Sequence, residues 1–403
     1  MDKKLVILQV HNFYQLPGGE DTVIENERLL LESQGHRVVR YFRDNKELKD
    51  FSVFRKLLLP VTTIFNPKTY REVRRLIRAE HIDIVHVHNT LNLISPSVYY
   101  AALAEGVPVV QTVHNFRLLC PGATFYRDGH ICEDCLTHGL GCAVKHSCYR
   151  GSKLQTLACV ISTKIHRMTG IYGKLNYICL TEFNREKLLK LKQIRPERVF
   201  VKPNFVENYP EPILPEERRL NQMVFAGRLE KLKGVEVLLT AWKLLGQKAP
   251  TLILCGTGPM EGWCRDFIVE NGLNVEMPGF LDNRQVRCLM AESKAMILPT
   301  QCYEGFPMSI VEAFSVGTPV VCSNLGNAGS IVTEGVTGRK FHPDSPEDLA
   351  HAVQNCGGLC RSTYRAYLAV YTSQENYVCL KQIYDVIRDS GDAAEEIKME
   401  GAR

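Results

Sequence analysis

The chain alternates short apolar strand patterns with amphipathic helix patterns along most of its length, and this alternation limits its fold more than any other feature. Repeated strand–helix units imply a parallel sheet covered by helices on both faces. The first half is expected to hold strands at Leu5–Val10, Arg37–Phe42, Ile82–His88, Val107–His114, Asn176–Thr181 and Val199–Lys202. The second half repeats the pattern with strands at Gln222–Ala226, Thr251–Cys255, Val275–Pro278, Ala295–Pro299 and Pro319–Cys322.

A proline-rich segment divides the chain. Pro203–Pro215 holds four prolines in thirteen residues and has no periodicity, as is typical of a linker. A chain of 403 residues is also too long for one ordinary core. We therefore expect an α/β protein of two Rossmann-like, doubly wound domains that face each other across a cleft and bind ligands at the carboxyl ends of their strands. The expected divisions are a first domain at 1–203, a linker at 204–215, a second domain at 216–375, a C-terminal helix at 376–390 that returns to the first domain, and a tail at 391–403.

The composition is that of a soluble globular protein, with 45% apolar and 23% charged residues. No run of 18 apolar residues is present, so no transmembrane helix is expected. The N-terminus lacks the cleavage site of a signal peptide. We expect a cytoplasmic protein whose 15 cysteines are thiols or metal ligands rather than disulfides.

Two stretches of the first half are basic. Phe51–Glu80 has seven Lys or Arg residues against two acids, interleaved with apolar residues, and Lys145–Arg195 has eleven against two. The first stretch suits an anionic membrane surface, which would place the protein at the inner face of the membrane as a peripheral protein. A solvated helix face explains the pattern equally well. No nucleic-acid-binding motif accompanies the charge, so nucleic acid is not expected as a partner.

Two glutamates stand eight residues apart at the start of a helix expected at Phe306–Val316. Glu304 precedes this helix and Glu312 lies about two turns inside it. A helix N-terminus offers free N–H groups and a partial positive charge, which suit a phosphate. The two carboxylates would contact different parts of one elongated ligand. The spacing alone fits two surface glutamates on an amphipathic helix better.

Other loops after expected strands carry groups that suit a phosphorylated ligand. Arg228 and Lys233 lie five residues apart after the first strand of the second domain, where a planar fork and a point charge could bracket a diphosphate. Gly18 and Gly19 precede an expected helix and would let the backbone approach a ligand. His114 ends a strand, where its imidazole could bond a sugar hydroxyl. A basic surface loop, a tight turn and a packed histidine are the plain alternatives.

The segment from Glu304 to Pro319 resembles the E-x7-E signature of the retaining family-4 glycosyltransferases, and Gly227–Gly234 resembles their G-R-x4-K-G motif. The resemblance implies the GT-B architecture and retaining transfer of a sugar from a nucleotide-diphosphate donor to a glycan or lipid-linked acceptor, in cell-surface polysaccharide biosynthesis. It implies that Arg228 and Lys233 hold the donor phosphates, that Glu304 binds the sugar and Glu312 the ribose, and that His114 reaches the reacting sugar. The further donor-binding residues that it implies are Gly18, Gly19, Glu20, Asn204, Gly256, Gly258, Gly305, Phe306, Pro307, Met308 and Ser309.

No catalytic cofactor is expected. The sequence has no convincing Asp-x-Asp pair for a divalent metal, so the charge on the leaving diphosphate would be stabilised by the basic side chains and the helix N-terminus. Ser330 departs from the family, which usually has an acidic residue there. The rival class is a non-catalytic nucleotide-sugar-binding protein on the same fold. An epimerase or a phosphorylase is a second enzymatic rival, although no pyridoxal-phosphate lysine site is evident.

Five cysteines lie within the 29 residues of an insertion expected at 120–148. Cys132 and Cys135 have the two-residue spacing of a zinc knuckle, and Cys120 and Cys148 would complete four ligands for a structural zinc. A loop with free thiols is the alternative, because five cysteines do not fix a connectivity.

Overall fold

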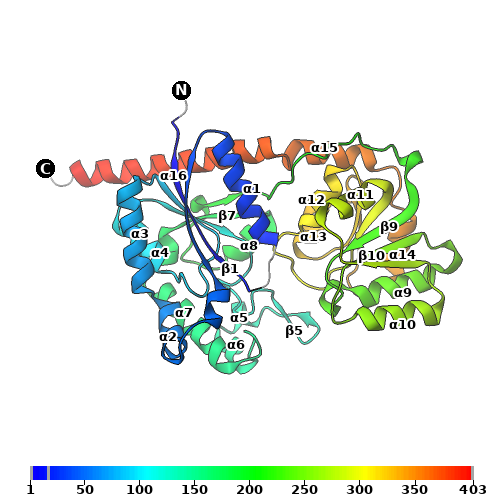
Figure 1. Ribbon diagram of the computed structural model, residues 1–403, viewed down its shortest axis with the longest axis horizontal. Coiled ribbons are helices and arrows are strands. Elements are labelled where there is room, and N and C mark those ends of the chain that lie inside the picture. Colours follow the sequence, from blue (N-terminus) through cyan, green and yellow to red (C-terminus); the bar gives the residue numbers. More distant parts are fainter. Residues whose placement is uncertain (1–2, 16–18, 401–403) are drawn as a thin grey trace. The chain divides into compact units, whose positions relative to one another are not determined.

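The structure is a computed structural model that describes residues 3–15 and 19–400, with side chains as far as residue 389. It divides into two compact units (Figure 1). The first unit holds residues 1–123, 133–202 and the chain from Tyr377 onward, and the second holds 124–132 and 203–376. Residues 124–132 were expected in the first domain. They group with the second unit because Phe125 is buried there against Tyr303, with ring centroids 6.2 Å apart.

The first unit is built on a six-stranded parallel sheet in the order β2-β1-β3-β4-β7-β8. The strands are β1 (Val6–Phe13), β2 (Arg37–Asp44), β3 (Ile84–Val87), β4 (Val109–Val113), β7 (Asn176–Cys179) and β8 (Val199–Val201). Its helices are α1 (Gly19–Ser33), α2 (Val53–Ile64), α3 (Pro67–Glu80), α4 (Ser97–Ala104), α5 (Asp134–Thr137), α6 (Gly141–Lys145), α7 (Lys153–Met168), α8 (Glu182–Leu188) and α16 (Ser373–Glu400).

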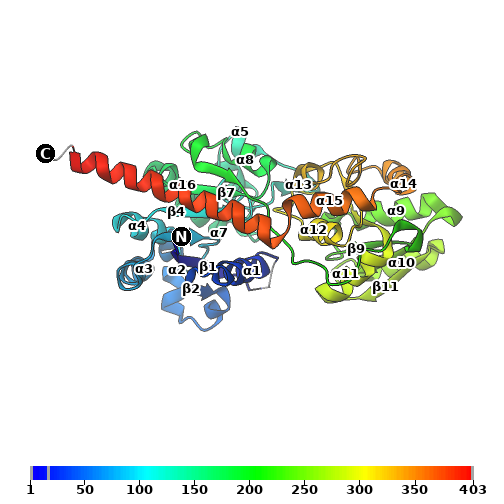
Figure 2. The same cartoon turned by 90° about the horizontal axis from the view of Figure 1, so that it is seen from above.

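Helix α16 supplies one wall of the first unit's core. Its apolar side chains Leu380, Ile383, Tyr384 and Ile387 are buried against Leu5, Ile7, Ile84, Val110 and Ile178 of the sheet strands and the residues beside them. Figures 1 and 2 show this helix lying along the unit. Helix α16 begins at Ser373, and it remains helical through most of the expected tail, as far as Glu400.

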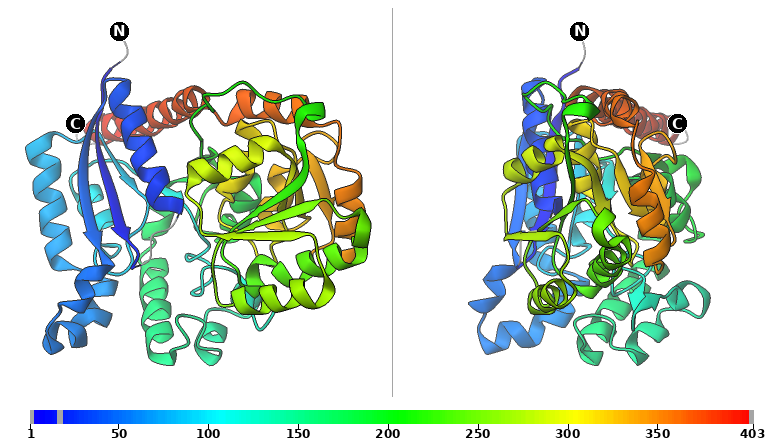
Figure 3. Two further views of the ribbon diagram at one scale, coloured as in Figure 1. Left: turned by 45° about the vertical axis from the view of Figure 1, so that its right-hand side comes forward. Right: turned by 90° about the vertical axis from the view of Figure 1, so that its right-hand side faces the viewer.

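The second unit is a second six-stranded parallel sheet, in the order β11-β10-β9-β12-β13-β14, with helices on both faces (Figure 3). Its strands are β9 (Leu220–Ala226), β10 (Thr251–Cys255), β11 (Val275–Gly279), β12 (Ser293–Leu298), β13 (Val320–Ser323) and β14 (Gly338–Phe341). Its helices are α9 (Val235–Leu245), α10 (Glu261–Asn271), α11 (Asn283–Glu292), α12 (Met308–Ser315), α13 (Gly326–Ile331), α14 (Pro346–Gln354) and α15 (Cys360–Val370). A small hairpin, β5 (Tyr126–Arg127) with β6 (His130–Ile131), belongs to the same unit.

Alternating strand residues feed two separate apolar clusters, one on each face of the second sheet. Met296 and Val320 pack with residues of α11 and α12, whereas Ala295, Ile297 and Val321 pack with residues of α9 and α14. The direction of chain progression reverses between β9 and β12, and between β1 and β3 in the first unit. Doubly wound sheets bind their ligands at the carboxyl ends of strands on either side of such a reversal.

The structure holds several elements that the sequence did not predict, namely helices α2, α5, α6, α7 and α13, strand β14 and the β5–β6 hairpin. Helix α12 begins at Met308 rather than at Phe306 because Pro307 occupies the N-cap position in an extended conformation. Among the helices that the structure describes, none combines the length and the apolar character needed to cross a bilayer.

Candidate active site

Lys233 and Glu304 meet at the carboxyl edge of the second unit's sheet. Lys233 lies on the loop after β9 and Glu304 on the loop after β12, on either side of the reversal in strand order. The Lys233 Nζ atom is 2.7 Å from Glu304 Oε1, and the Thr300 hydroxyl donates to the same oxygen at 2.9 Å. Burial lowers the pKa of Lys233, but the attraction of Glu304 outweighs it and raises the pKa. The site therefore holds a fixed ammonium beside a carboxylate.

Gly234 allows these two loops to approach each other. Its φ is +74°, and a Cβ atom there would lie 1.8 Å from the carbonyl oxygen of Pro299. The Gln301 N–H donates to the Leu232 carbonyl at 2.9 Å alongside it. Only glycine combines this backbone conformation with so close a contact. The glycine thus places Lys233 within reach of Glu304.

The Glu304 loop is held in place by Asn327, a buried residue of α13 that the sequence analysis did not single out. Its side-chain amide donates to the carbonyl oxygens of Glu304 and Gly305, the latter at 2.7 Å. Gly326 precedes it with φ +49°, and a Cβ there would lie 2.7 Å from the Tyr303 ring. The Gly326–Asn327 pair, which begins three residues after the last residue of β13, was the signal in the sequence for this interaction.

Arg228 and Glu312 lie outside the Lys233–Glu304 contact. Arg228 is mostly exposed, and its Nε atom is 3.4 Å from Glu230 Oε2. Glu312 lies on α12, where burial raises its pKa although Arg287 opposes the shift. An exposed guanidinium can close on an anion as it binds, whereas a largely buried carboxyl group suits a neutral hydroxyl partner.

The glycines after β10 have a structural reason that needs no ligand. Gly256 has φ +134°, and a Cβ atom there would lie 1.9 Å from the Gly227 carbonyl oxygen. A Cβ atom at Gly258 would lie 2.3 Å from the Leu229 carbonyl oxygen. The two residues let the loops after β9 and β10 pack backbone against backbone.

The remaining donor-binding candidates of the second unit fall into two groups. Phe306 and Met308 pack against the apolar core and so anchor the start of α12, with Gly305 and Pro307 forming the turn before it and Ser309 in its first turn. Asn204 is buried, and its Oδ1 atom accepts no hydrogen bond from the residues that the structure describes. An unpaired buried carbonyl of this kind can accept a hydrogen bond from a ligand.

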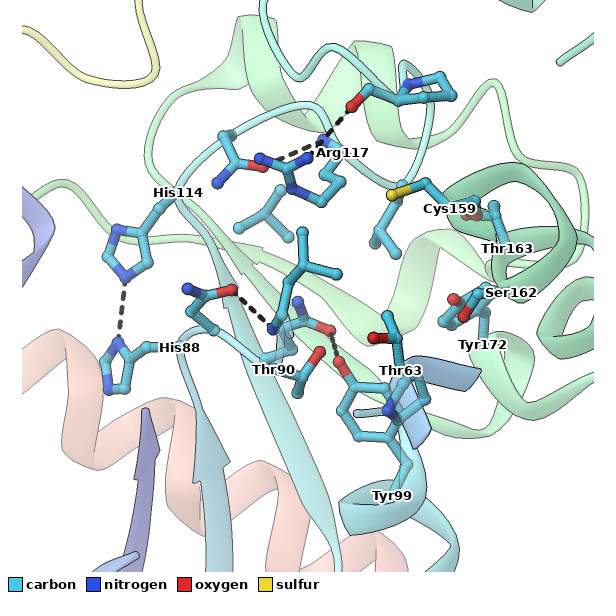
Figure 4. A pocket seen from close by; sticks show the side chains of 18 residues that line it. Thr63, His88, Thr90, Tyr99, His114, Arg117, Cys159, Ser162, Thr163 and Tyr172 are labelled. Carbon is cyan, nitrogen blue, oxygen red and sulfur yellow. Dashed lines mark hydrogen bonds between the residues drawn. The ribbon is translucent and has the colours of Figure 1, made fainter. Parts of the chain in front are cut away.

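In the first unit, His114 follows β4 and His88 follows β3 at the same edge of the sheet. Both rings are buried, and His114 Nε2 is 3.0 Å from His88 Nδ1 (Figure 4). Burial, together with the nearby rings of His88 and His11, holds the pKa of His114 well below its usual range. His114 is therefore neutral at neutral pH.

A buried charge cluster lies behind these rings. Glu27 of α1 has one carboxylate oxygen 3.2 Å from Lys202 Nζ, and the other 3.2 Å from His86 Nδ1 and 3.4 Å from His88 Nε2. Burial would raise the pKa of Glu27, but these neighbours hold it well below the usual value. Burial also lowers the pKa of His86 to about 3, so this ring is neutral at neutral pH.

The cluster bears on the tautomer of His114. With the proton of His88 on Nε2, the nitrogen 3.4 Å from Glu27, His88 Nδ1 is an acceptor. His114 Nε2 would then donate to His88, and the Nδ1 atom of His114 would carry the lone pair. In this tautomer His114 could accept a hydrogen bond from a hydroxyl group. The sequence analysis did not single out Glu27. The signal in the sequence was a glutamate at helical spacing from apolar residues on both sides, Val23 and Ile24 before it and Leu30 and Leu31 after it.

A polar pocket adjoins His114 in the first unit (Figure 4). Thr63 of α2 and Ser162 and Thr163 of α7 form one side, and Tyr99 and Gln111, joined by a 2.7 Å hydrogen bond, form another. Nine of the 18 lining residues carry a hydroxyl or amide group, so the pocket suits a polar group of a ligand.

The glycine-rich loop is described only in part. Gly18 lies outside the described residues, and Gly19 is the first residue of α1. Burial raises the pKa of Glu20 to about 8, helped by Asp21 and opposed by Arg117 and Tyr14. Glu20 is therefore mostly protonated at neutral pH and can donate a hydrogen bond.

Cys135 of the first unit's insertion lies near other cysteines of the same segment. Burial raises the pKa of Cys135 to about 12, and the nearby Cys120, Cys148 and Cys142 add to the shift. Cys132 is half-buried and belongs to the segment that groups with the second unit. Among the side chains that the structure describes, no three of these thiols have sulfur atoms within 4.8 Å of one another, whereas ligands of one zinc ion lie that close together. The structural zinc stays a prediction.

Known proteins resemble this chain in both sequence and fold. Residues 17–130 match the model of "Glycosyltransferase Family 4" and residues 211–356 match that of "Glycosyl transferases group 1", together more than half of the chain. An uncharacterized glycosyltransferase of Methanocaldococcus jannaschii is 25% identical over 61% of this chain and 70% of its own length. A human phosphatidylinositol N-acetylglucosaminyltransferase component is 23% identical over 80% of this chain and 62% of its own. The chain spans only a third of the Mycobacterium tuberculosis glycogen synthase, at 33% identity.

Among solved structures, a glycosyltransferase from Rickettsia africae superimposes with a TM-score of 0.68 at 17% identity, covering 96% of this chain and 99% of that one. The Anabaena protein solved in complex with UDP and glucose gives 0.56 at 18% identity, with 98% and 100% covered. These likenesses agree with the two parallel sheets described above. The chain belongs to glycosyltransferase family 4 and has the GT-B fold.

Proposed function

We propose that the protein is a retaining glycosyltransferase that moves a sugar, a hexose in type, from a nucleotide-diphosphate donor to a glycan or lipid-linked acceptor in cell-surface polysaccharide biosynthesis. The contact of Lys233 with Glu304 carries this proposal, because it sets a cation and a carboxylate side by side at the ligand-binding edge of a doubly wound sheet.

The donor half of the reaction falls to the second unit. Lys233 and Arg228 would take the diphosphate, and the first N–H groups of α12 would add their dipole. As the bond to the sugar breaks, charge develops on the leaving diphosphate, and cations fixed in advance stabilise it. No divalent metal is required in this proposal. Glu304 would bind sugar hydroxyls and Glu312 the ribose.

The acceptor half falls to the first unit, where the neutral His114 lies beside a pocket lined by hydroxyl and amide groups. Relatives include a human protein named for a phosphatidylinositol substrate and an Escherichia coli O-antigen chain mannosyltransferase, 26% identical over 44% of this chain. Their names support a glycan or lipid-linked acceptor. The peripheral membrane location belongs to the same proposal.

A thermal-shift panel tests the donor half. The wild type and Glu312→Ala are heated with UDP, GDP, ADP and their common sugars. One nucleotide should raise the melting temperature of the wild type and raise that of the variant less. Glu270→Ala, which removes an exposed glutamate of α10, is the matched control and should behave as the wild type. No shift with any nucleotide in folded protein would contradict the proposal.

The alternative, a non-catalytic nucleotide-sugar-binding protein, predicts the same shifts without turnover. Release of the nucleotide diphosphate from its sugar in the presence of a membrane lipid extract separates the two. The anomeric configuration of the product, read by NMR, then tests retention. Addition of EDTA tests metal independence, and the proposal expects no loss of rate.

The structural zinc is a separate proposal with its own test. Metal analysis of the purified protein should find one zinc per chain, and Cys135→Ser should remove it. If the folded protein contains no metal, the zinc proposal is wrong and the cysteines of this segment are free thiols. The proposed reaction is not affected by that result.

A further inference from the structure

Two adjacent helices of the first unit expose most of their apolar side chains. Only Thr63 of α2 is buried, and this helix leaves Val53, Phe54, Leu57, Leu58 and Val61 exposed. Helix α7 buries one side, yet it exposes Leu154, Leu157, Ile161, Ile165 and Met168. Leu57 is 72% exposed, Leu154 80% and Met168 86%. We call these ten side chains the α2–α7 face.

The exposed residues form a stripe on each helix. On α7 they recur at intervals of three or four residues, which places them along one side of a helix. The stripe on α2 follows the same spacing. The two helices pack against each other, and Figure 1 shows them together at the edge of the unit. Monomeric soluble proteins seldom expose so many large apolar side chains on neighbouring elements.

The charges on the same helices identify the partner. Helices α2 and α7 carry Arg55, Lys56, Lys153, Lys164 and Arg167 and have no aspartate or glutamate. An apolar stripe bordered by basic residues alone is the pattern of a helix that lies in the interface of an anionic bilayer. A protein partner would need acidic residues and apolar pockets that match these helices in detail, and the two helices show no feature that requires such a match.

Helix α3, in contrast, does not fit a lipid surface. Its apolar residues Val73 and Ile77 are buried, and Arg74 and Arg78 both pair with Glu105. The α3 part of the basic stretch Phe51–Glu80 is therefore partly neutralised within the protein. The α2 part of that stretch forms the lipid-facing surface together with α7, which the sequence did not indicate.

We propose that the α2–α7 face docks on an anionic phospholipid bilayer. Thr63 of α2 and Ser162 and Thr163 of α7 also line the pocket beside His114. The role that we give to membrane docking, delivery of a lipid-linked acceptor to this pocket, rests on the proposed function. Helices lying on the lipid would thereby form a wall of the acceptor pocket. A lipid-linked acceptor could enter that pocket with its lipid still in the bilayer.

Vesicle flotation of the full chain tests the docking. The protein is mixed with vesicles of phosphatidylcholine alone or of equal parts phosphatidylcholine and phosphatidylglycerol. Binding to the anionic vesicles alone is expected, and it should weaken as salt rises. Leu57→Ser with Leu154→Ser should reduce the partition coefficient about tenfold or more for each leucine. Lys153→Glu with Lys164→Glu should reduce it about fivefold or more for each charge.

The controls separate this inference from the proposed function and from misfolding. Val269→Ser with Phe280→Ser removes apolar side chains that are equally exposed, 80% and 78%, in the second unit, and should leave binding unchanged. Every variant should keep the wild-type melting temperature and nucleotide-dependent shift. If no nucleotide raises the melting temperature of the wild type but the wild type still binds anionic vesicles, the proposed function is overturned and the docking proposal is not.

Three outcomes would overturn the docking proposal: no binding of the wild type to anionic vesicles, unchanged binding of the leucine variant, or a wild-type dimer that the leucine variant dissociates. The last would show that a second copy of the chain covers the face.

Discussion

Replacing Glu27 by glutamine should destabilise the first unit strongly. The Glu27 carboxylate is the anion 3.2 Å from Lys202 Nζ, and both side chains are 2% exposed. The substitution keeps the size of the side chain and removes its charge, so that the buried ammonium of Lys202 loses the carboxylate 3.2 Å away. Loss of one member of a buried ion pair costs about 3–5 kcal/mol. The histidines cannot replace the lost charge, because an imidazole ring is neutral or positively charged at neutral pH.

Urea unfolding followed by far-UV circular dichroism measures this cost. A loss of about 3 kcal/mol should lower the midpoint by roughly 1 M urea for a unit of this size. Both tryptophans, Trp242 and Trp263, lie in the second unit, so their fluorescence reports a part of the chain that the substitution does not touch. A shift in the dichroism without a matching shift in the fluorescence would locate the damage in the first unit.

The double variant Glu27→Gln with Lys202→Met separates the charge from the packing. Removal of both charges should recover most of the lost stability, because no unpaired ion is then left in the core. The reasoning is refuted if Glu27→Gln alone costs less than about 1 kcal/mol, the range of an exposed pair. A double variant no more stable than the single one would also refute it.

Three further outcomes are expected. Lys233→Met should lower kcat/KM for transfer by roughly 100-fold or more, as loss of one fixed charge at a leaving group does. Lys231→Met in the same loop should leave kcat/KM unchanged. Equal losses of kcat/KM in the two variants would assign the effect to the loop and not to the charge of Lys233. Gly234→Ala should cost about 2 kcal/mol or more in urea unfolding because its Cβ meets a backbone carbonyl, whereas Gly262→Ala, in open space on α10, should be neutral or stabilising. For Glu20, the pKa of about 8 in the folded state exceeds the 4.5 of the unfolded state, so the folded state holds the extra proton and its stability falls as pH rises between those values. The melting temperature of Glu20→Gln minus that of the wild type should therefore grow as pH rises over this window. A constant difference would contradict the raised pKa.

Most strands of the two sheets could be predicted from the sequence because buried parallel strands are short apolar runs with clear ends. The edge strand β14 was missed because Gly338–Phe341 contains Arg339 and Lys340 and is not an apolar run. The helices α2 and α7 could not be predicted, for a physical reason. Helix prediction relies on an apolar side that packs on the core and a polar side that faces water. Helix α2 instead exposes its apolar residues and contains Pro60, and α7 has apolar residues on two sides. The features that hid these helices are the ones that indicate a lipid surface.

The contact between Lys233 and Glu304 could be predicted from the sequence, but the residues that hold their loops in place could not. Lys233 and Glu304 lie 71 positions apart, and the expected reversal of strand order brings their loops to one edge. The sequence could not indicate that Gly256 and Gly258 serve loop packing, because the carbonyl oxygens they accommodate belong to another loop. Nor could it indicate that Asn327 holds the Glu304 loop. Hydrogen bonds between loops become visible only when the strands are in place.

The charged side chains of the two units differ in their exposure to solvent, and this difference supports separate roles for the two units in the proposed reaction. The second unit keeps Lys233 as a cation beside Glu304 and leaves Arg228 exposed, so an anionic ligand meets cationic side chains there. The first unit buries its ion pair behind the histidines and keeps His114 neutral. A neutral imidazole suits a hydroxyl group, and cations suit a diphosphate. In the proposed reaction, the donor's diphosphate and the acceptor's hydroxyl group would therefore be bound by different units of the chain.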